Sequence, residues 1–172
     1  MSGTATGGAW DLARVGMLDA AGIPAHSVNW KSTKGAAPSL IDLIGGHVQV
    51  VCCSIPEAAN QIESGELRVL AVMSPERLAN YPDVPTAKEQ GVDWVAVGWR
   101  GLAVPNDTPD EVVDKLYAVC EKIAKSAEYK KFMADRGYAI QIRGPKEFSA
   151  FLAEQDEQWK PVIAAGGYVK HP

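Results

Sequence analysis

The segment from residue 65 to residue 105 constrains the fold of this chain more than any other. It opens with an apolar run at residues 67–73 that is rich in Leu and Val. Such runs are typical of strands in a sheet covered on both faces. A connector with two prolines follows at residues 81–86, and its X-Pro bonds favour extended backbone over helix. A second strand is predicted at residues 94–104, long enough to cross between two domains.

Helix and strand patterns alternate along the rest of the chain. The other predicted elements are helices at residues 8–21, 36–44 and 54–64, further helices starting near residues 108, 126 and 145, and strands at residues 26–30, 47–53 and 138–142. This alternation is typical of a mostly parallel sheet flanked by helices and wrapped by right-handed crossovers. The sequence therefore predicts an α/β fold.

Composition excludes several classes of protein. Apolar residues make up 47% of the 172 residues, which is ample for a core, and the net charge of −4 argues against a nucleic-acid surface. The apolar runs are shorter than a membrane span, and no export signal opens the chain. Cys52, Cys53 and Cys120 form neither a disulfide framework nor a metal-ligand spacing. We therefore expect no metal, no cofactor and no nucleic-acid partner.

Residues 1–8 form the first candidate site. They resemble a loop that feeds a helix with no strand before it, so we expect the chain to begin within a domain. A helix N-terminus offers unpaired N–H groups and the positive end of the helix dipole, which favour an anion such as a carboxylate. The candidate ligand-binding residues here are Ser2, Gly3, Thr4, Ala5 and Thr6. An ordinary capped helix start or a disordered tail would explain the same residues.

The helix predicted at residues 36–44 provides the second candidate site. Gly35, Ala36 and Ala37 lie at its start, after a polar turn. Lys31 and Lys34 in that turn are either ligand contacts or solvated surface lysines.

Ser54 is the third candidate, because it follows a strand in a position where ligands of α/β sheets collect. Its spacing to Glu57 also predicts a capping box, which explains Ser54 without a ligand. Both roles are compatible.

A thiol hydrolase is the rival interpretation. Cys52 or Cys53 would be the nucleophile, with His26 or His47 nearby in the sequence. No glycine-rich nucleophile turn accompanies them, and adjacent strand residues point to opposite faces. Buried, inert cysteines are the favoured interpretation.

Three tryptophans and one arginine each allow two interpretations. Trp30, Trp94 and Trp99 either line a cleft or pack in the core. Arg100 pairs either with a ligand carboxylate or with an acid near a hinge.

The amino-acid sequence of residues 65–105 resembles that of a known family. The matching residues are Leu70-Ala71-Val72, Ser74, Arg77, Pro82-Asp83-Val84-Pro85-Thr86, Glu89, Gly91, Trp99, Gly101-Leu102-Ala103 and Pro105. They resemble the Bug-type (TctC) extracytoplasmic receptors of tripartite tricarboxylate transporters. The resemblance implies a fold like that of type II periplasmic binding proteins, with one complete domain and part of a second.

The family resemblance also implies a function without catalysis. Residues 1–97 would form the second, ligand-binding domain, and residues 98–172 the crossover strand and the C-terminal part of the first. A small organic acid would bind in the cleft between the domains and be delivered to the membrane subunits of the transporter, in the periplasm. The N-terminal part of the first domain would be missing, and a non-transport interaction module derived from a receptor fragment is therefore a further alternative to the thiol hydrolase. We expect the unpaired sheet edges of the first domain to be covered by another chain or to cause self-association.

Two residues of the first candidate site depart from the family pattern. Ala5 stands where glycine is common, and Asp11 stands where many members carry histidine. A carboxylate at position 11 would repel an anion if it faced the pocket. The ligand is therefore expected to differ from a plain dicarboxylate in its second group.

Overall fold

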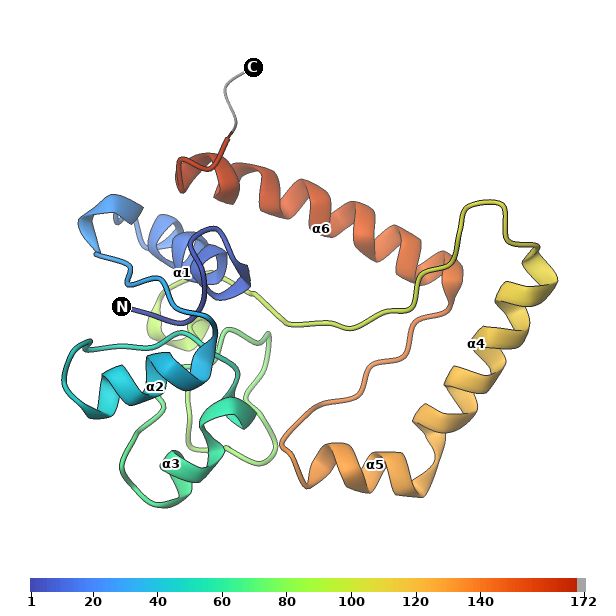
Figure 1. Ribbon diagram of the computed structural model, residues 1–172, viewed down its shortest axis with the longest axis horizontal. Coiled ribbons are helices and arrows are strands. Elements are labelled where there is room, and N and C mark those ends of the chain that lie inside the picture. Colours follow the sequence, from blue (N-terminus) through green and yellow to red (C-terminus); the bar gives the residue numbers. More distant parts are fainter. Residues whose placement is uncertain (170–172) are drawn as a thin grey trace. The chain divides into compact units, whose positions relative to one another are not determined.

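The computed structural model describes residues 1–169, and these residues divide into two compact units (Figure 1). The first unit combines Met1–Gly98 with the residues from Gln158 onward, and the second is Trp99–Glu157. Helix α6, Pro145–Ala165, contributes residues to both units. The predicted domain assignment, residues 1–97 and 98–172, stays a prediction.

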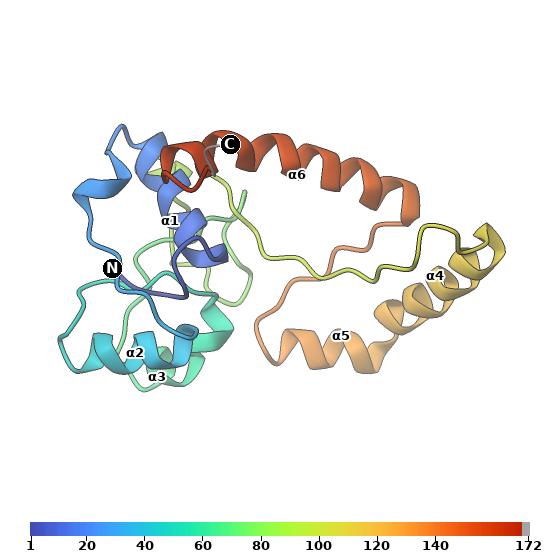
Figure 2. The same cartoon turned by 45° about the horizontal axis from the view of Figure 1, so that its top comes forward.

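The first unit contains the helices predicted in the N-terminal half. They are α1 (Ala9–Ala20), α2 (Ala36–Ile44) and α3 (Ala59–Glu63), together with the 3-10 turns η1 (Ala25–Ser27), η2 (Ile55–Ala58) and η3 (Lys88–Gln90). The turn η2 packs against α2 and continues directly into α3. Helices α2 and α3 lie near each other in both views (Figures 1 and 2). The predicted helices at residues 8–21, 36–44 and 54–64 are therefore confirmed within one or two residues. The third begins with a 3-10 turn, η2, before it becomes the α-helix α3.

Parallel pairing is present in the first unit, but only at single residues. Ser2 pairs in parallel with Lys31 on one side and Val51 on the other, and Val72 pairs in parallel with Thr86. The Ser2 N–H donates to the Val50 carbonyl at 3.0 Å, and the Cys52 N–H donates to the Ser2 carbonyl at 2.9 Å. The predicted parallel direction is thus confirmed where segments meet.

The predicted continuous strands are wrong for residues 1–169, because no pairing there extends beyond a single residue. A strand requires a ladder of neighbours, and the middle segment turns away into a loop directly after Ser2. The start of the strand predicted at residues 26–30 forms the 3-10 turn η1 instead. Residues 94–104 and 138–142 form no strand in the described part of the chain, although the Ala96 N–H donates to the Met73 carbonyl at 2.9 Å.

Helix α1 organises the core of the first unit. Ala13, Val15 and Leu18 are buried on it, with Val15 completely inaccessible. Gly16 lets the ring of Trp94 lie against the helix, since a Cβ at position 16 would sit 2.1 Å from that ring. The other apolar residues buried in this unit are Ala36, Leu40, Val48, Cys52, Ile55, Ala58, Val72, Ala87 and Val162.

The proline connector of the first unit is held by side chains. Arg77 donates to both carboxylate oxygens of Glu89, at 2.9 and 3.0 Å, and to the Pro82 carbonyl at 2.9 Å. Glu89 also accepts from the Thr86 N–H at 2.8 Å. The predicted non-helical connector is confirmed, and these bonds give several of the residues that carry the family resemblance a local structural role.

The second unit is built differently. Its helices are α4 (Asp110–Lys125), α5 (Ala127–Ala134) and the first part of α6. Trp99 packs edge-on against Phe148 and Phe151. Helix α4 carries an apolar stripe of Val112, Leu116, Val119 and Ile123, but these residues are exposed, and neither α4 nor α5 carries a buried residue.

Candidate functional site

The first two candidate segments lie side by side in the first unit. The Thr33 N–H donates to the Thr4 carbonyl at 3.2 Å, and the Thr6 N–H donates to the Ser32 hydroxyl at 3.3 Å. The turn that leads to Gly35 therefore runs along the loop of residues 2–6. The structure thus brings together two segments that are about 30 residues apart in the sequence.

A series of hydrogen bonds between hydroxyl groups fixes this arrangement. The Ser2 hydroxyl donates to the Lys31 carbonyl at 2.7 Å and lies 2.9 Å from the Ser39 hydroxyl. Ser39 in turn lies 2.7 Å from Thr33, which donates to the Gly35 carbonyl at 3.0 Å. Ser2 and Ser39 are both fully buried. Sequence reasoning missed Ser39, although its place one turn after Gly35 on α2 is a signal that could have identified it.

Backbone donors are left open where the two segments meet. The bonds recorded for the loop involve the N–H groups of Ser2, Thr6, Gly7 and Gly8. Among residues 1–169, no acceptor is recorded for the N–H groups of Gly3, Thr4 and Ala5. Such groups bind an acceptor from outside the chain most readily.

The start of α2 adds further donors. Gly35 is its N-cap residue, with φ of 138°, a conformation that favours glycine, and no side chain caps the helix. Ala36 and Ala37 occupy its first turn, and Pro38 has no N–H to offer. The N-terminal end of the helix dipole therefore lies next to the loop of residues 2–6.

Gly3 is required by its surroundings. A Cβ at position 3 would lie 2.2 Å from the Cys52 carbonyl oxygen and 2.9 Å from the Trp30 ring. A backbone oxygen in a paired segment cannot move away cheaply. Any side chain at position 3 would therefore displace the loop.

Asp11 does not face an anion as a free charge. Its side chain is fully buried, and its carboxylate lies 2.8 Å from the Arg14 guanidinium. It also accepts from the Gly7 N–H at 2.9 Å and from the Tyr168 hydroxyl at 2.5 Å. The expected repulsion at this position is therefore offset by Arg14, which sequence reasoning did not single out.

Arg14 is itself fully engaged. It donates to the carbonyls of Ala25 and Val28, at 2.9 and 3.2 Å, and its guanidinium lies 5.3 Å from the Trp30 ring centroid. A buried ion pair contributes to stability only when its remaining donors and acceptors are satisfied, and these bonds meet that requirement.

Ser54 forms the predicted capping box. Its N–H and its hydroxyl both donate to the Glu57 carboxylate, at 2.9 and 2.7 Å. Its hydroxyl is thus already engaged, and its ligand role stays a prediction.

The lysines of the polar turn differ in their surroundings. Lys31 pairs with Asp42 at 2.8 Å while half of its side chain stays exposed. Lys34 is exposed.

Cys52 and Cys53 lack the properties of a nucleophile. Burial raises the pKa of the Cys52 thiol to about 12 and that of the Cys53 thiol to about 11. Thiols with such pKa values are protonated at neutral pH and do not attack. Burial of Cys52 is confirmed, whereas Cys53 is only partly buried.

The tryptophans pack against neighbouring side chains. Trp30 contacts Gly3 and Arg14, and Trp94 stacks edge-on against Trp159. Within the described residues, the indole N–H groups of Trp30 and Trp94 are buried with no acceptor. Arg100 donates to the Trp99 carbonyl.

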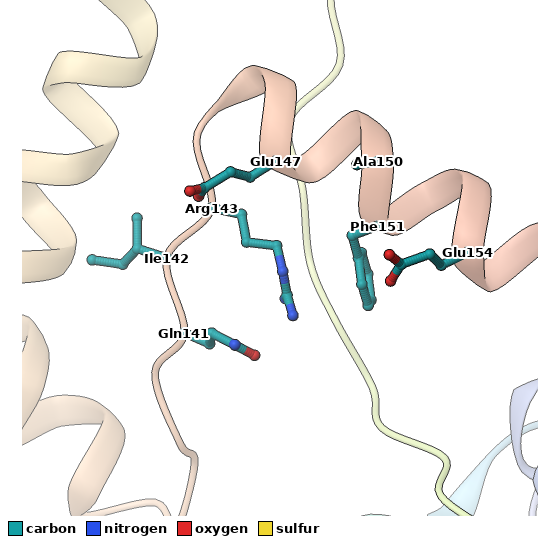
Figure 3. Close-up of a pocket in the computed structure, with 7 residues that line it drawn as sticks. All are labelled: Gln141, Ile142, Arg143, Glu147, Ala150, Phe151 and Glu154. Carbon is teal, nitrogen blue, oxygen red and sulfur yellow. The ribbon is translucent and has the colours of Figure 1, made fainter.

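A hollow lies elsewhere, in the second unit. It has a volume of about 400 Å³ and is lined by residues 141–154, with the Arg143 guanidinium over the ring of Phe151 (Figure 3). None of the candidate residues lines it. Among the described residues, no His, Cys, Asp and Glu cluster suits a metal, and no helix is long and apolar enough to cross a membrane.

Comparison with known proteins identifies the class. The model of the tripartite tricarboxylate transporter family receptor matches residues 5–168, so the chain belongs to this family. Its members are solute-binding receptors and not a class of enzymes, and the fold is that of periplasmic binding proteins.

Individual relatives agree with this assignment. BugT of Bordetella pertussis is 29% identical over 142 residues, covering 82% of this chain and 44% of BugT. The periplasmic binding protein BugD is 29% identical with a TM-score of 0.80, covering 99% of this chain and 57% of BugD. MatC from Rhodopseudomonas palustris, solved with bound malate, is 24% identical with a TM-score of 0.76, covering 94% and 55%. The chain thus spans less than half of BugT.

Proposed function

We propose that this chain is the ligand-binding part of a periplasmic solute receptor that captures a small organic acid and releases it unchanged. The observation that carries the proposal is the adjacency of the loop of residues 2–6 and the start of α2, joined by the bond from Thr33 to Thr4. Both segments present backbone donors without acceptors among residues 1–169. Donors held in this way suit a carboxylate, because an ionised acceptor forms the stronger hydrogen bonds.

Each candidate residue has a role in this proposal. Gly3, Thr4 and Ala5 offer backbone N–H groups, and the Thr4 and Thr6 hydroxyls add donors at the rim. Gly35, Ala36 and Ala37 offer the N–H groups of the first turn of α2. Ser2 holds the loop in place through its buried hydroxyl. Ser54 contributes to the site from its position at the start of η2.

The wider role follows from the family. Residues 1–97 form the ligand-binding domain and residues 98–172 complete part of the other domain, with the anion in the cleft between them. The loaded receptor docks on the membrane subunits of a tripartite tricarboxylate transporter. The differential affinity of the ligand for the closed state drives closure of the domains.

The exposed apolar faces of the second unit support a further partner surface. Leu102, Leu116, Val119 and Ile123 are between 44% and 76% exposed. Exposed apolar surface of this extent is covered in most stable proteins. We propose that another polypeptide segment covers it, and that the chain by itself self-associates through it.

A titration tests the ligand proposal. Citrate, malate and adipate are added to the chain, and binding is measured by calorimetry together with the shift in thermal midpoint. Malate is included because MatC, which shares the fold, was solved with it. We expect at least one organic anion to bind and the neutral amide analogue malamide not to bind.

A matched pair of variants locates the binding. Thr4→Val removes a hydroxyl from the loop, and Thr108→Val makes the same change in the second unit. The first should weaken binding by about tenfold, whereas the second should leave it unchanged. Failure of every organic anion to bind, or equal effects of the two variants, would count against the proposal.

A further inference from the structure

Tyr168 connects the C-terminal segment to the start of the chain. Its hydroxyl donates to Asp11 across 157 positions of sequence. Its ring also lies over Gly7, since an ideal Cβ at position 7 would be 4.0 Å from the ring. The residue therefore contacts both Gly7, which follows the loop of residues 2–6 directly, and the first turn of α1.

Asp11 links Tyr168 to the backbone at the end of the loop through hydrogen bonds. One of its oxygens accepts from both Tyr168 and the Gly7 N–H, while the other accepts from Arg14. Burial and the hydrogen bond to Asp11 raise the pKa of Tyr168, so its hydroxyl keeps the proton that it donates. The Gly7 N–H is thus fixed at the point where the loop enters α1.

The buried acid has no remaining capacity for a ligand. Arg14, Gly7 and Tyr168 occupy its carboxylate, and the side chain is inaccessible. An ammonium group of a ligand therefore gains no partner at position 11. Asp11 acts on the site only through the geometry of the loop.

We propose that Tyr168, Asp11 and Arg14 form a brace that sets the affinity of the loop of residues 2–6 for its organic anion. This inference rests on the proposed function. Tyr168 is a positioning residue, because it does not reach the open N–H groups itself. Without the brace, the loop samples more conformations, and the anion must order it on binding, which lowers affinity.

The test compares Tyr168→Phe with Tyr81→Phe, a control in the same unit whose hydroxyl has no recorded bond among the described residues. Hydrogen exchange of the Gly7 amide is measured by NMR without ligand, and malate and adipate affinities are measured by calorimetry. We expect Tyr168→Phe to speed Gly7 exchange by about fivefold and weaken the anion by about tenfold. The thermal midpoint should fall further than in Tyr81→Phe, because the fully buried Asp11 loses a donor.

The two readouts separate the brace from the ligand proposal. Unchanged Gly7 exchange in Tyr168→Phe overturns the brace, and so does unchanged affinity when the wild-type chain binds. If the wild-type chain binds none of these anions, the proposed function fails. The brace is then decided by the Gly7 exchange alone, which requires no ligand.

Discussion

Both units of this chain contain regular helices, but the helices of the two units differ in how many of their residues are buried. Helix α1 carries six buried residues and surrounds its ion pair with further hydrogen bonds. Helix α4 is longer, with acids in its first turn and lysines in its last, yet none of its residues is buried. Local signals are therefore sufficient to form a helix, whereas only the first unit shows a well-developed core around one.

The largest expected effect concerns the loop of residues 2–6 in the first unit. Gly3→Ala should destabilise the first unit by about 3 kcal/mol, because the added methyl group meets the Cys52 carbonyl. Chemical denaturation followed by tryptophan fluorescence measures the change.

Gly98→Ala is the matched control for that substitution. Its Cβ would meet only the Trp10 ring, at an ordinary 4.0 Å. A stability loss in Gly3→Ala no larger than in Gly98→Ala would mean that the loop is not held as described.

An intermediate effect should separate the cores of the two units. Val15→Ala removes two methyl groups from a fully inaccessible site and should cost about 2 kcal/mol of unfolding free energy. Leu116→Ala, on the exposed face of α4, should change it by less than about 0.5 kcal/mol. This small change applies at protein concentrations below those of the proposed self-association, and a loss that grows with protein concentration would show that another copy covers this face.

The smallest expected effect is at the surface of the first unit. The hydrogen bonds from Arg77 and Thr86 hold the pKa of Glu89 at about 2, below its ordinary value. Because the folded-state pKa is depressed, the stabilisation is present above pH 4.5 and is lost as the pH falls toward 2. The group is exposed, so solvent screens most of the effect.

Thermal midpoints between pH 7 and pH 3 test this surface pair. Glu89→Gln should lower the midpoint slightly at pH 7, and the difference from wild type should shrink as the pH falls. Glu66→Gln, at an exposed position without a recorded partner among residues 1–169, serves as the control. A difference that grows toward pH 3 would contradict the assigned sign.

The sequence by itself determined the helices, the connector and the family. The capping spacing of Ser54 and Glu57 and the helix at residues 36–44 depend on neighbours within a few residues, so their patterns suffice. The same locality explains why the loop of residues 2–6 and the residues around Gly35 could be identified as candidates.

Only the tertiary structure decided what those candidates touch. Ser39 reaches Ser2 across 37 positions of the sequence and Tyr168 reaches Asp11 across 157, and no local pattern records such contacts. Asp11 was predicted as a source of repulsion, and its pairing with Arg14 became visible only once α1 was packed. The strands were over-predicted for the same reason, because extended backbone becomes sheet only when a distant segment lies beside it.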